Sequence, residues 1–201
     1  MLFRSYRFEL QGFYTLSHAT GNVLAGADEF RITAAGYQPD LRTVRDQSVN
    51  PYDPLCSACT GPLDTDARHR VGLSGLYRGP YGINLSGILR YHSATPYTDW
   101  AGADLNGDGY RFDLPPGVSH VNALRGSSFS QMDVRLAKAF KFFGNYGVEL
   151  IGEVFNLFNS KNEAGFVGSR TSKAYKQPSF FAGDPGQGEQ RLAQLGVRVT
   201  F

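Results

Sequence analysis

The chain has 201 residues, a formal net charge of +2 at pH 7 and a pI of about 8.5, so its charge gives no reason to expect a nucleic-acid partner. Its 24 glycines, 11 tyrosines and 15 phenylalanines, set against two methionines, favour an all-β protein. No segment approaches the roughly 18 to 20 consecutive apolar residues of a membrane-spanning helix. The mean hydropathy of −0.30 does not exclude a membrane barrel, because barrel strands are apolar on one face only.

Six segments alternate apolar and polar residues, which is the pattern of strands with one apolar face. The clearest is the last, where every second residue from Ala193 to Phe201 is apolar. Phe13, Leu76 and Lys138 are exceptions that fall on the wrong face of their segments. In chain order, the predicted strands span 5–17, 70–79, 81–93, 130–142, 146–157 and 191–201.

The predicted strands are roughly 9 to 13 residues long, whereas strands of soluble proteins typically hold about 5 or 6. A tilted transmembrane strand needs about 9 to 11 residues. Aromatic residues near the ends of the apolar stripes fit the girdles of a membrane barrel; they are Tyr6, Tyr14, Tyr81, Tyr91, Phe140, Phe142 and Phe201.

The connections between the predicted strands alternate between short and long. Residues 79–80 and 143–145 have the composition of tight turns, whereas the connections 18–69, 94–129 and 160–190 are long. Outer-membrane barrels combine short periplasmic turns with long extracellular loops. We therefore predict an antiparallel transmembrane β-barrel segment in a Gram-negative outer membrane, with extracellular long loops and a periplasmic C-terminus. The alternative is a soluble β-sandwich or β-solenoid.

Charged residues fall on the polar side of the predicted strands. An Arg or Lys that faces lipid at mid-depth costs about 2 to 4 kcal/mol, so these side chains should face the barrel lumen. Two roles remain open for them, a network that solvates the wall and holds the strand register, or direct contact with a ligand. The predicted lumen-facing residues are Arg7, Glu9, Arg78, Arg90, Asp133, Arg135, Glu149, Glu153 and Arg198.

The chain contains several different short motifs in a characteristic order. They occupy 66–70, 85–88, 93–97, 104–109, 115–117, 122–126, 132–138, 153–159 and 194–201. In this order they resemble the C-terminal part of the β-barrel of a TonB-dependent outer-membrane receptor, in the Oar-like subgroup with an N-terminal carboxypeptidase-regulatory-like domain. The resemblance covers nearly the whole chain.

The resemblance implies a 22-stranded barrel with an N-terminal plug, energised by a periplasmic TonB-type protein. It also implies that the barrel-assembly machinery reads the last strand and its terminal Phe201. Six strands cannot enclose a lumen, and the N-terminus lacks a signal-peptide pattern. We therefore expect the chain to be a fragment without plug or signal peptide, inactive alone, from a receptor that imports a large or scarce solute whose identity the sequence does not indicate. The alternative is a structural, adhesive or export-linked barrel without import.

Residues 104–109 (Asp-Leu-Asn-Gly-Asp-Gly) resemble the first half of a calcium loop. Asp104, Asn106 and Asp108 would supply oxygen ligands, and Asp113 would replace the missing acidic residue at the twelfth position, which is Pro115. A bound Ca²⁺ and a loop held by Asx turns remain alternative interpretations.

Cys56 and Cys59 form a Cys-x-x-Cys motif in the first long connection. Outside the cell, a local disulfide is the favoured interpretation, and metal binding is the alternative. The sequence has no nucleophile elbow, phosphate-binding glycine loop or paired catalytic carboxylates. We therefore do not expect an enzyme.

Overall fold

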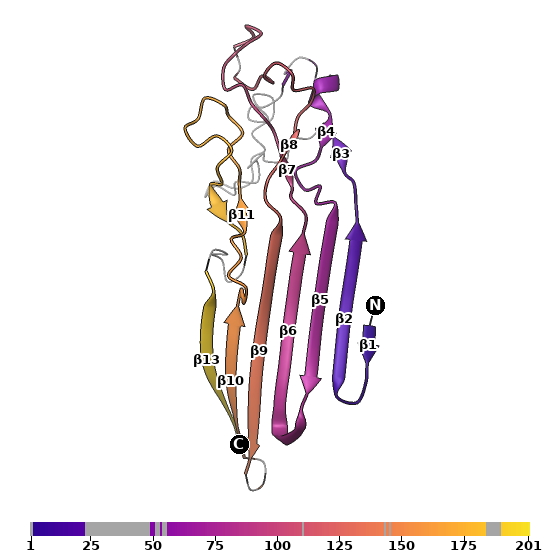
Figure 1. The fold of residues 1–201 in the computed structure, drawn as a ribbon, viewed down its shortest axis with the longest axis vertical. Coiled ribbons are helices and arrows are strands. Elements are labelled where there is room, and N and C mark those ends of the chain that lie inside the picture. Colours follow the sequence, from indigo (N-terminus) through magenta and orange to yellow (C-terminus); the bar gives the residue numbers. More distant parts are fainter. Residues whose placement is uncertain are drawn as a thin grey trace, which may run out of the picture.

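The computed structural model describes residues 2–22, 49–50, 53, 56–109, 111–142, 144, 146–183 and 190–201. Its main element is one antiparallel sheet in which neighbours along the chain are neighbours in space (Figure 1). The all-β antiparallel prediction is thereby confirmed. In sheet order the strands are β1 (Leu2–Arg4), β2 (Phe8–Leu16), β5 (His69–Arg78), β6 (Ile83–His92), β9 (Phe129–Lys141), β10 (Gly147–Phe155) and β13 (Leu192–Thr200).

Each of the six predicted segments overlaps one long strand of this sheet, but several ends differ. The third was predicted to start at Tyr81, whereas Tyr81 has φ 58° and lies in the 3₁₀ turn η3 (Pro80–Gly82). The fifth was predicted to reach residue 157, but it stops at Phe155, before Asn156 with φ 51°. The short edge strand β1 was not predicted.

The connections separate by length to the two ends of the sheet (Figure 1). The long ones lie together at one end, here called the loop end, and the short turns lie at the other, the turn end. Within the long connections, short strands pair as β3 (Thr20–Gly21) with β4 (Gly61–Pro62), β7 (Pro96–Tyr97) with β8 (Leu124–Arg125), and β11 (Glu163–Ala164) with β12 (Phe180–Phe181).

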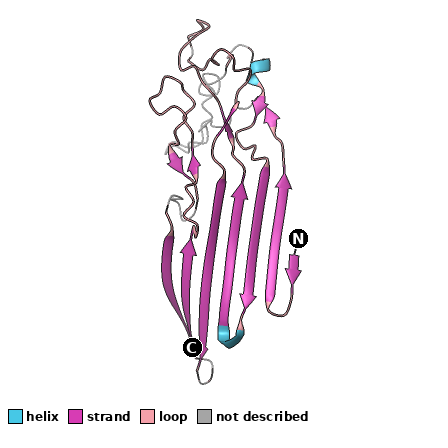
Figure 2. Ribbon diagram, in the orientation of Figure 1, coloured by secondary structure: helices cyan, strands magenta, loops and turns pink. Residues whose placement is uncertain are grey.

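Helix is confined to short turns in the described part of the chain (Figure 2). The turn η2 (Ser57–Cys59) lies at the loop end, and η3 joins β5 to β6 at the turn end. Among the described residues, no helix is long and apolar enough to cross a membrane.

The strand register places most of the large apolar residues of the six long strands on one face, with Phe13, Leu76, Ile88 and Ile151 among the exceptions. Leu73 pairs with Leu89, and Leu89 with Met132, across β5, β6 and β9. One complete row runs through Leu10, Gly75, Gly87, Val134, Val154 and Ala193. Because side chains alternate along a strand, the other face carries the charged residues. We call these the apolar face and the charged face.

The apolar face is open. Leu85, Leu136 and Leu195 are 44%, 53% and 92% exposed. The buried apolar residues of the described chain lie mainly at the loop end, as Cys59, Ala67 and Val121 do, while Ala137 is the one in the sheet. The long strands are thus not packed around a core of their own.

Candidate functional site

Ion pairs line the charged face of the sheet. Arg135 and Glu153 are direct cross-strand partners on β9 and β10, 3.3 Å apart. Arg198 and Glu149 are likewise partners on β13 and β10, at 3.3 Å. Gln194 also donates to Glu153. These contacts link three neighbouring strands.

Two further ion pairs extend this network toward the other edge. Arg90 on β6 reaches Asp133 on β9 at 3.2 Å, and Arg78 on β5 lies 3.8 Å from Glu9 on β2. Eight of the nine residues predicted to face the lumen thus form four pairs on one face. The ninth, Arg7, lies in the turn before β2, where its carbonyl accepts the Arg78 N–H at 2.7 Å.

Lys138 is the charged residue that the register places on the apolar face, opposite Ile83 and Leu150. It lies near the turn end, where its ammonium donates to the carbonyl of Tyr81 and sits 5.3 Å from the centre of the Phe140 ring. A lysine at this level can extend its amine toward the sheet rim. The exception therefore leaves the central part of the apolar face uncharged.

A buried carboxylate, Asp66, joins two of the long connections. Arg125 donates to its Oδ2 at 2.7 Å and to its backbone carbonyl at 2.7 Å, and the Ala19 N–H donates to its Oδ1 at 3.0 Å. Burial by itself raises the pKa of Asp66, but the hydrogen bonds from Arg125 and Ala19 outweigh it and hold the pKa below its ordinary value.

A second carboxylate, Asp99, joins the second long connection to the third. Arg170 donates to both of its oxygens, at 3.0 and 2.8 Å, and the Tyr175 hydroxyl donates at 2.8 Å. Asp99 is 3% exposed. The bidentate arginine lowers the pKa of this carboxyl, and the carboxyl in turn raises the pKa of Arg170. The three long connections are therefore tied into one unit at the loop end.

Under these connections lies a cavity of about 400 Å³, here called the loop cavity. Its floor includes His92 and Phe129, cross-strand partners of β6 and β9 whose rings stack at 5.0 Å. They continue the alternation of the charged face, two residues beyond Arg90 and Gln131. Four further aromatic residues of the connections line the cavity: Tyr97, Trp100, Phe112 and Phe166.

Two polar atoms at the loop cavity have no hydrogen-bond partner among the described residues. They are Asp64 Oδ1 and Asn162 Nδ2, and both atoms are buried. Asn162 is 2% exposed and is held in place because its Oδ1 accepts the Ser130 N–H at 2.9 Å. Burial raises the pKa of Asp64. Both residues line the loop cavity, but neither of these two atoms is open to it.

The predicted calcium residues do not converge on one point. Asp104 uses both oxygens on its own loop, accepting from Gly107 N–H at 2.7 Å and Gly109 N–H at 2.8 Å, which lowers its pKa. Asp113 accepts from Leu105 N–H at 2.5 Å and Asn106 N–H at 3.2 Å. Among the described residues, no group of three or more His, Cys, Asp and Glu side chains is arranged to hold a metal. This geometry favours the Asx-turn interpretation of the loop.

Asn106 and Asp108 pair with each other instead. The Asn106 Nδ2 donates to Asp108 Oδ2 at 3.1 Å, and the Asp108 N–H donates to Asn106 Oδ1 at 2.9 Å. All four residues singled out for calcium therefore stabilise the conformation of their own segment.

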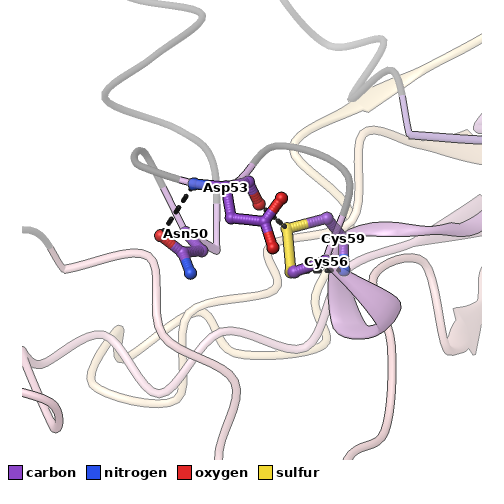
Figure 3. The surroundings of a disulfide bond; sticks show 4 residues. All are labelled: Asn50, Asp53, Cys56 and Cys59. Carbon is purple, nitrogen blue, oxygen red and sulfur yellow. Dashed lines mark hydrogen bonds between the residues drawn. A yellow bond between two sulfur atoms is a disulfide. The ribbon is translucent and has the colours of Figure 1, made fainter.

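Cys56 and Cys59 form a disulfide bond around η2, with Cα atoms 5.0 Å apart (Figure 3). The Cys59 sulfur lies 3.5 Å from the carbonyl oxygen of Asp53, whose N–H donates to Asn50 at 3.1 Å. The enclosed Ala58 carbonyl accepts the Val121 N–H at 3.0 Å. The disulfide thus fixes a turn that bonds the first long connection to the second.

The residues at the centre of the loop end were not identified from the sequence as a site. Asp99 contacts partners 71 and 76 residues away, and Arg125 contacts Asp66 across 59 residues. No local spacing signals such contacts, since they depend on how the connections fold over the sheet. Phe201, predicted as an assembly signal, is 93% exposed at the turn end.

Comparisons of the chain with protein-family models, with curated proteins and with solved structures give no match.

Proposed function

We propose that this chain forms part of the wall of an outer-membrane β-barrel, with its apolar face toward lipid and its charged face toward the lumen. The observation that carries the proposal is the register. It gathers the apolar stripes of six long strands on one exposed face and four ion pairs on the other.

The exposed apolar face needs a cover, because large apolar patches on soluble monomers are rare. A bilayer fits its dimensions: the long strands hold 9, 10, 10, 13, 9 and 9 residues, against about 9 to 11 for a tilted membrane strand. Tyr14 and Tyr91 lie near its loop end, and Tyr77 and Phe140 near its turn end. Aromatic residues at both ends match the interfacial girdles of membrane barrels.

The two edge strands of the sheet support the proposal that further strands complete it. In the described part of the chain, β13 has no strand beyond it, and β1 covers only Glu9, Leu10 and Gln11 of β2. Open strand edges are prohibitive in hydrocarbon because their N–H and C=O groups stay unpaired. We therefore propose a larger closed barrel, in keeping with the 22 strands that the family resemblance implies.

Within that barrel, we propose the role of a TonB-dependent receptor that takes up a solute with energy from a periplasmic TonB-type partner. The sequence motifs described above support this proposal, as do the long connections, which are tied together at the loop end around a cavity. The barrel-assembly machinery would be a second partner. In the structural, adhesive or export-linked alternative, the same long connections would form a docking surface.

Thiol labelling in intact Gram-negative cells tests the topology. The substitutions Asp108→Cys, in the connection between β7 and β8, and Tyr146→Cys, in the turn before β10, place single thiols at opposite ends of the sheet. A membrane-impermeant maleimide should label Asp108→Cys in intact cells, and Tyr146→Cys only after the outer membrane is permeabilised. The native cysteines form a disulfide and should not react. Labelling of both, or the reverse pattern, would contradict the proposed topology.

Energy dependence separates the two roles. If the protein is a receptor, solute accumulation should stop when a protonophore collapses the inner-membrane gradient or when the energy-coupling protein is deleted. Undiminished surface function under both treatments would favour the adhesive or structural role.

A further inference from the structure

We propose that the apolar face binds one anionic phospholipid near its turn end, with the phosphate at Lys138 and an acyl chain in a groove over β5, β6 and β9. This rests on the proposed function, which puts the apolar face in lipid and the turn end on the periplasmic side. Two separate features carry it: a cation without a counter-charge, and an apolar groove in the adjoining surface.

Lys138 has no carboxylate to pair with. The four paired arginines of the charged face each reach a carboxylate at 3.2 to 3.8 Å. Lys138 instead lies between Ile83 and Leu150. No Asp or Glu of the six long strands lies on the apolar face. An anion from outside the described part of the chain would therefore supply the missing counter-charge.

The depth of Lys138 suits a lipid phosphate. Lys138 is four residues from Val134 along β9, which is about 13 Å at roughly 3.3 Å per residue. A strand tilt of about 40° turns this into about 10 Å of depth, against about 12 Å for half of an apolar band that is about 25 Å tall. The ammonium donates to the carbonyl of Tyr81 in η3, so the side chain extends toward the turn end. It can thus reach the head groups while its stem stays in hydrocarbon.

The ammonium of Lys138 keeps donors for such a phosphate. An ammonium has three N–H groups, and the Tyr81 carbonyl is its only acceptor among the described residues. The Phe140 ring lies 5.3 Å from the nitrogen, and Tyr81 is 86% exposed. Phosphate oxygens form strong, charge-assisted hydrogen bonds with an ammonium. The lysine is therefore held in place with its remaining donors open to the lipid side.

An apolar groove of about 200 Å³ lies farther up the same face. Gly75 and Gly87 are cross-strand partners there and leave a gap, which Tyr77, Leu85 and Met132 border. A Cβ at Gly87 would meet nothing nearer than 3.5 Å, so the space above it is open. Because Leu85 is two residues from the partner of Lys138 on β6, a lipid with its phosphate at the lysine would lay an acyl chain along this groove.

The two features together select an anionic phospholipid. A free phosphate ion would satisfy the ammonium but leave the groove empty. A zwitterionic lipid would fill the groove but bring no net charge to the lysine, whereas anionic lipids attract each nearby Lys or Arg by about 1 kcal/mol. In the proposed topology the turn end meets the inner leaflet, where phospholipids present a phosphate directly above their acyl chains.

Quenching by spin-labelled lipids tests the inference on the complete protein, purified as its cell makes it and reconstituted in phosphatidylcholine vesicles. A fluorophore on Leu136→Cys lies two residues from Lys138 on the same face. The vesicles contain a small fraction of nitroxide-labelled phosphatidylglycerol or, in parallel, nitroxide-labelled phosphatidylcholine. We expect the anionic lipid to be enriched about fivefold at this position, as about 1 kcal/mol of attraction implies.

Matched variants assign the enrichment to the cation. Lys138→Gln should abolish the enrichment and Lys138→Arg should retain it, because only the first removes the charge. Lys141→Gln, on the charged face of the same strand, is the control and should leave the enrichment unchanged. Quenching by the phosphatidylcholine probe in each variant shows that the variant is inserted in the vesicle.

A second pair of variants tests the groove. Gly87→Leu should fill the groove and reduce the enrichment. Ala193→Leu lies in the same cross-strand row outside the groove and should not reduce it. Inorganic phosphate, compared with chloride at equal ionic strength, should not compete, since it cannot occupy the groove.

Equal enrichment of both lipids in the native protein, enrichment that survives Lys138→Gln, or loss of enrichment on adding inorganic phosphate would each overturn the lipid site. Enrichment that survives Gly87→Leu would overturn the placement of the acyl chain. Strong and equal quenching by both probes would leave the barrel standing. Absence of quenching by either probe would contradict the barrel and the lipid site together.

Discussion

At the scale of single residues, Gly168 holds two long connections together. The Trp100 N–H donates to the Gly168 carbonyl at 2.9 Å, and the Arg170 N–H donates to the Trp100 carbonyl at 2.9 Å. A Cβ at Gly168 would lie 1.8 Å from the carbonyl oxygen of Thr98. Because the Cβ would collide with a backbone oxygen, no flexible side chain can move aside. The two connections that carry Thr98 and Gly168 would have to separate.

We therefore expect Gly168→Ala to destabilise the loop end by about 1 to 3 kcal/mol, the usual cost of overpacking. Faster amide exchange at Trp100 and Arg170, with unchanged exchange in β6 and β9, is the measurable sign. Gly196→Ala in β13 is the control, since its Cβ would meet nothing nearer than 3.7 Å. Native exchange rates in Gly168→Ala would show that the two connections are not in contact.

The carboxylates Asp66 and Asp99 make the loop end sensitive to acid. Both have a folded-state pKa below the ordinary value of 3.8. Their contribution to stability is therefore complete above about pH 3.8 and declines as the pH falls through the lower folded-state values. Fluorescence of Trp100, which neighbours Asp99, should stay constant from pH 7 to about pH 4 and change below it.

Asp99→Asn is the matched variant for this prediction. It keeps the shape of the side chain but has no charge to lose, so the acid-induced fluorescence change should shrink. A transition centred near pH 6 would point instead to a histidine and would contradict the assignment.

At the scale of the strand, β9 carries a sharp contrast between two neighbours. Val134 lies on the apolar face between Gly87 and Val154, and Arg135 lies on the charged face, paired with Glu153 at 3.3 Å. An Arg facing lipid at mid-depth costs about 2 to 4 kcal/mol. Loss of one half-exposed ion pair costs about 1 kcal/mol or less.

Val134→Arg should therefore impair membrane insertion more strongly than Arg135→Val. The measurement is the fraction of protein that folds into lipid vesicles, read from heat-modifiable migration in electrophoresis. Arg198→Val, on the same face as Arg135, controls for simple loss of charge. Equal yields for the Val134 and Arg135 variants would refute the assignment of the two faces.

The long strands could be predicted from the sequence because alternation is a local signal that survives folding. The exception Phe13 is explained by its neighbour on the next strand, because its ring covers Gly72, its direct cross-strand partner. The ends of the strands were less predictable. Tyr81 is compatible with a strand by residue type, yet it takes a left-handed conformation in η3, since β5 must turn into β6 within a few residues.

At the scale of the whole molecule, the faces follow from the sequence but the loop end does not. Alternation assigns Leu89 and Arg90 to opposite faces without knowledge of any partner strand. By contrast, Asp99 with Arg170, and Asp64 with Asn162 at one cavity, are brought together by connections that are remote in sequence. The sequence also left two interpretations open for Asp104 and its neighbours, a cation site or a loop held by Asx turns, because oxygens that bind backbone N–H groups have the same spacing as oxygens that bind a metal.

Our proposal requires the apolar face to contact lipid hydrocarbon. Fluorophores attached through Leu85→Cys and Ser86→Cys, adjacent positions on β6 whose side chains lie on opposite faces, test it in vesicles containing lipids with nitroxide-labelled acyl chains. We expect strong quenching at position 85 and weak quenching at position 86. Equal and weak quenching at both positions would mean that protein, not lipid, covers the apolar face.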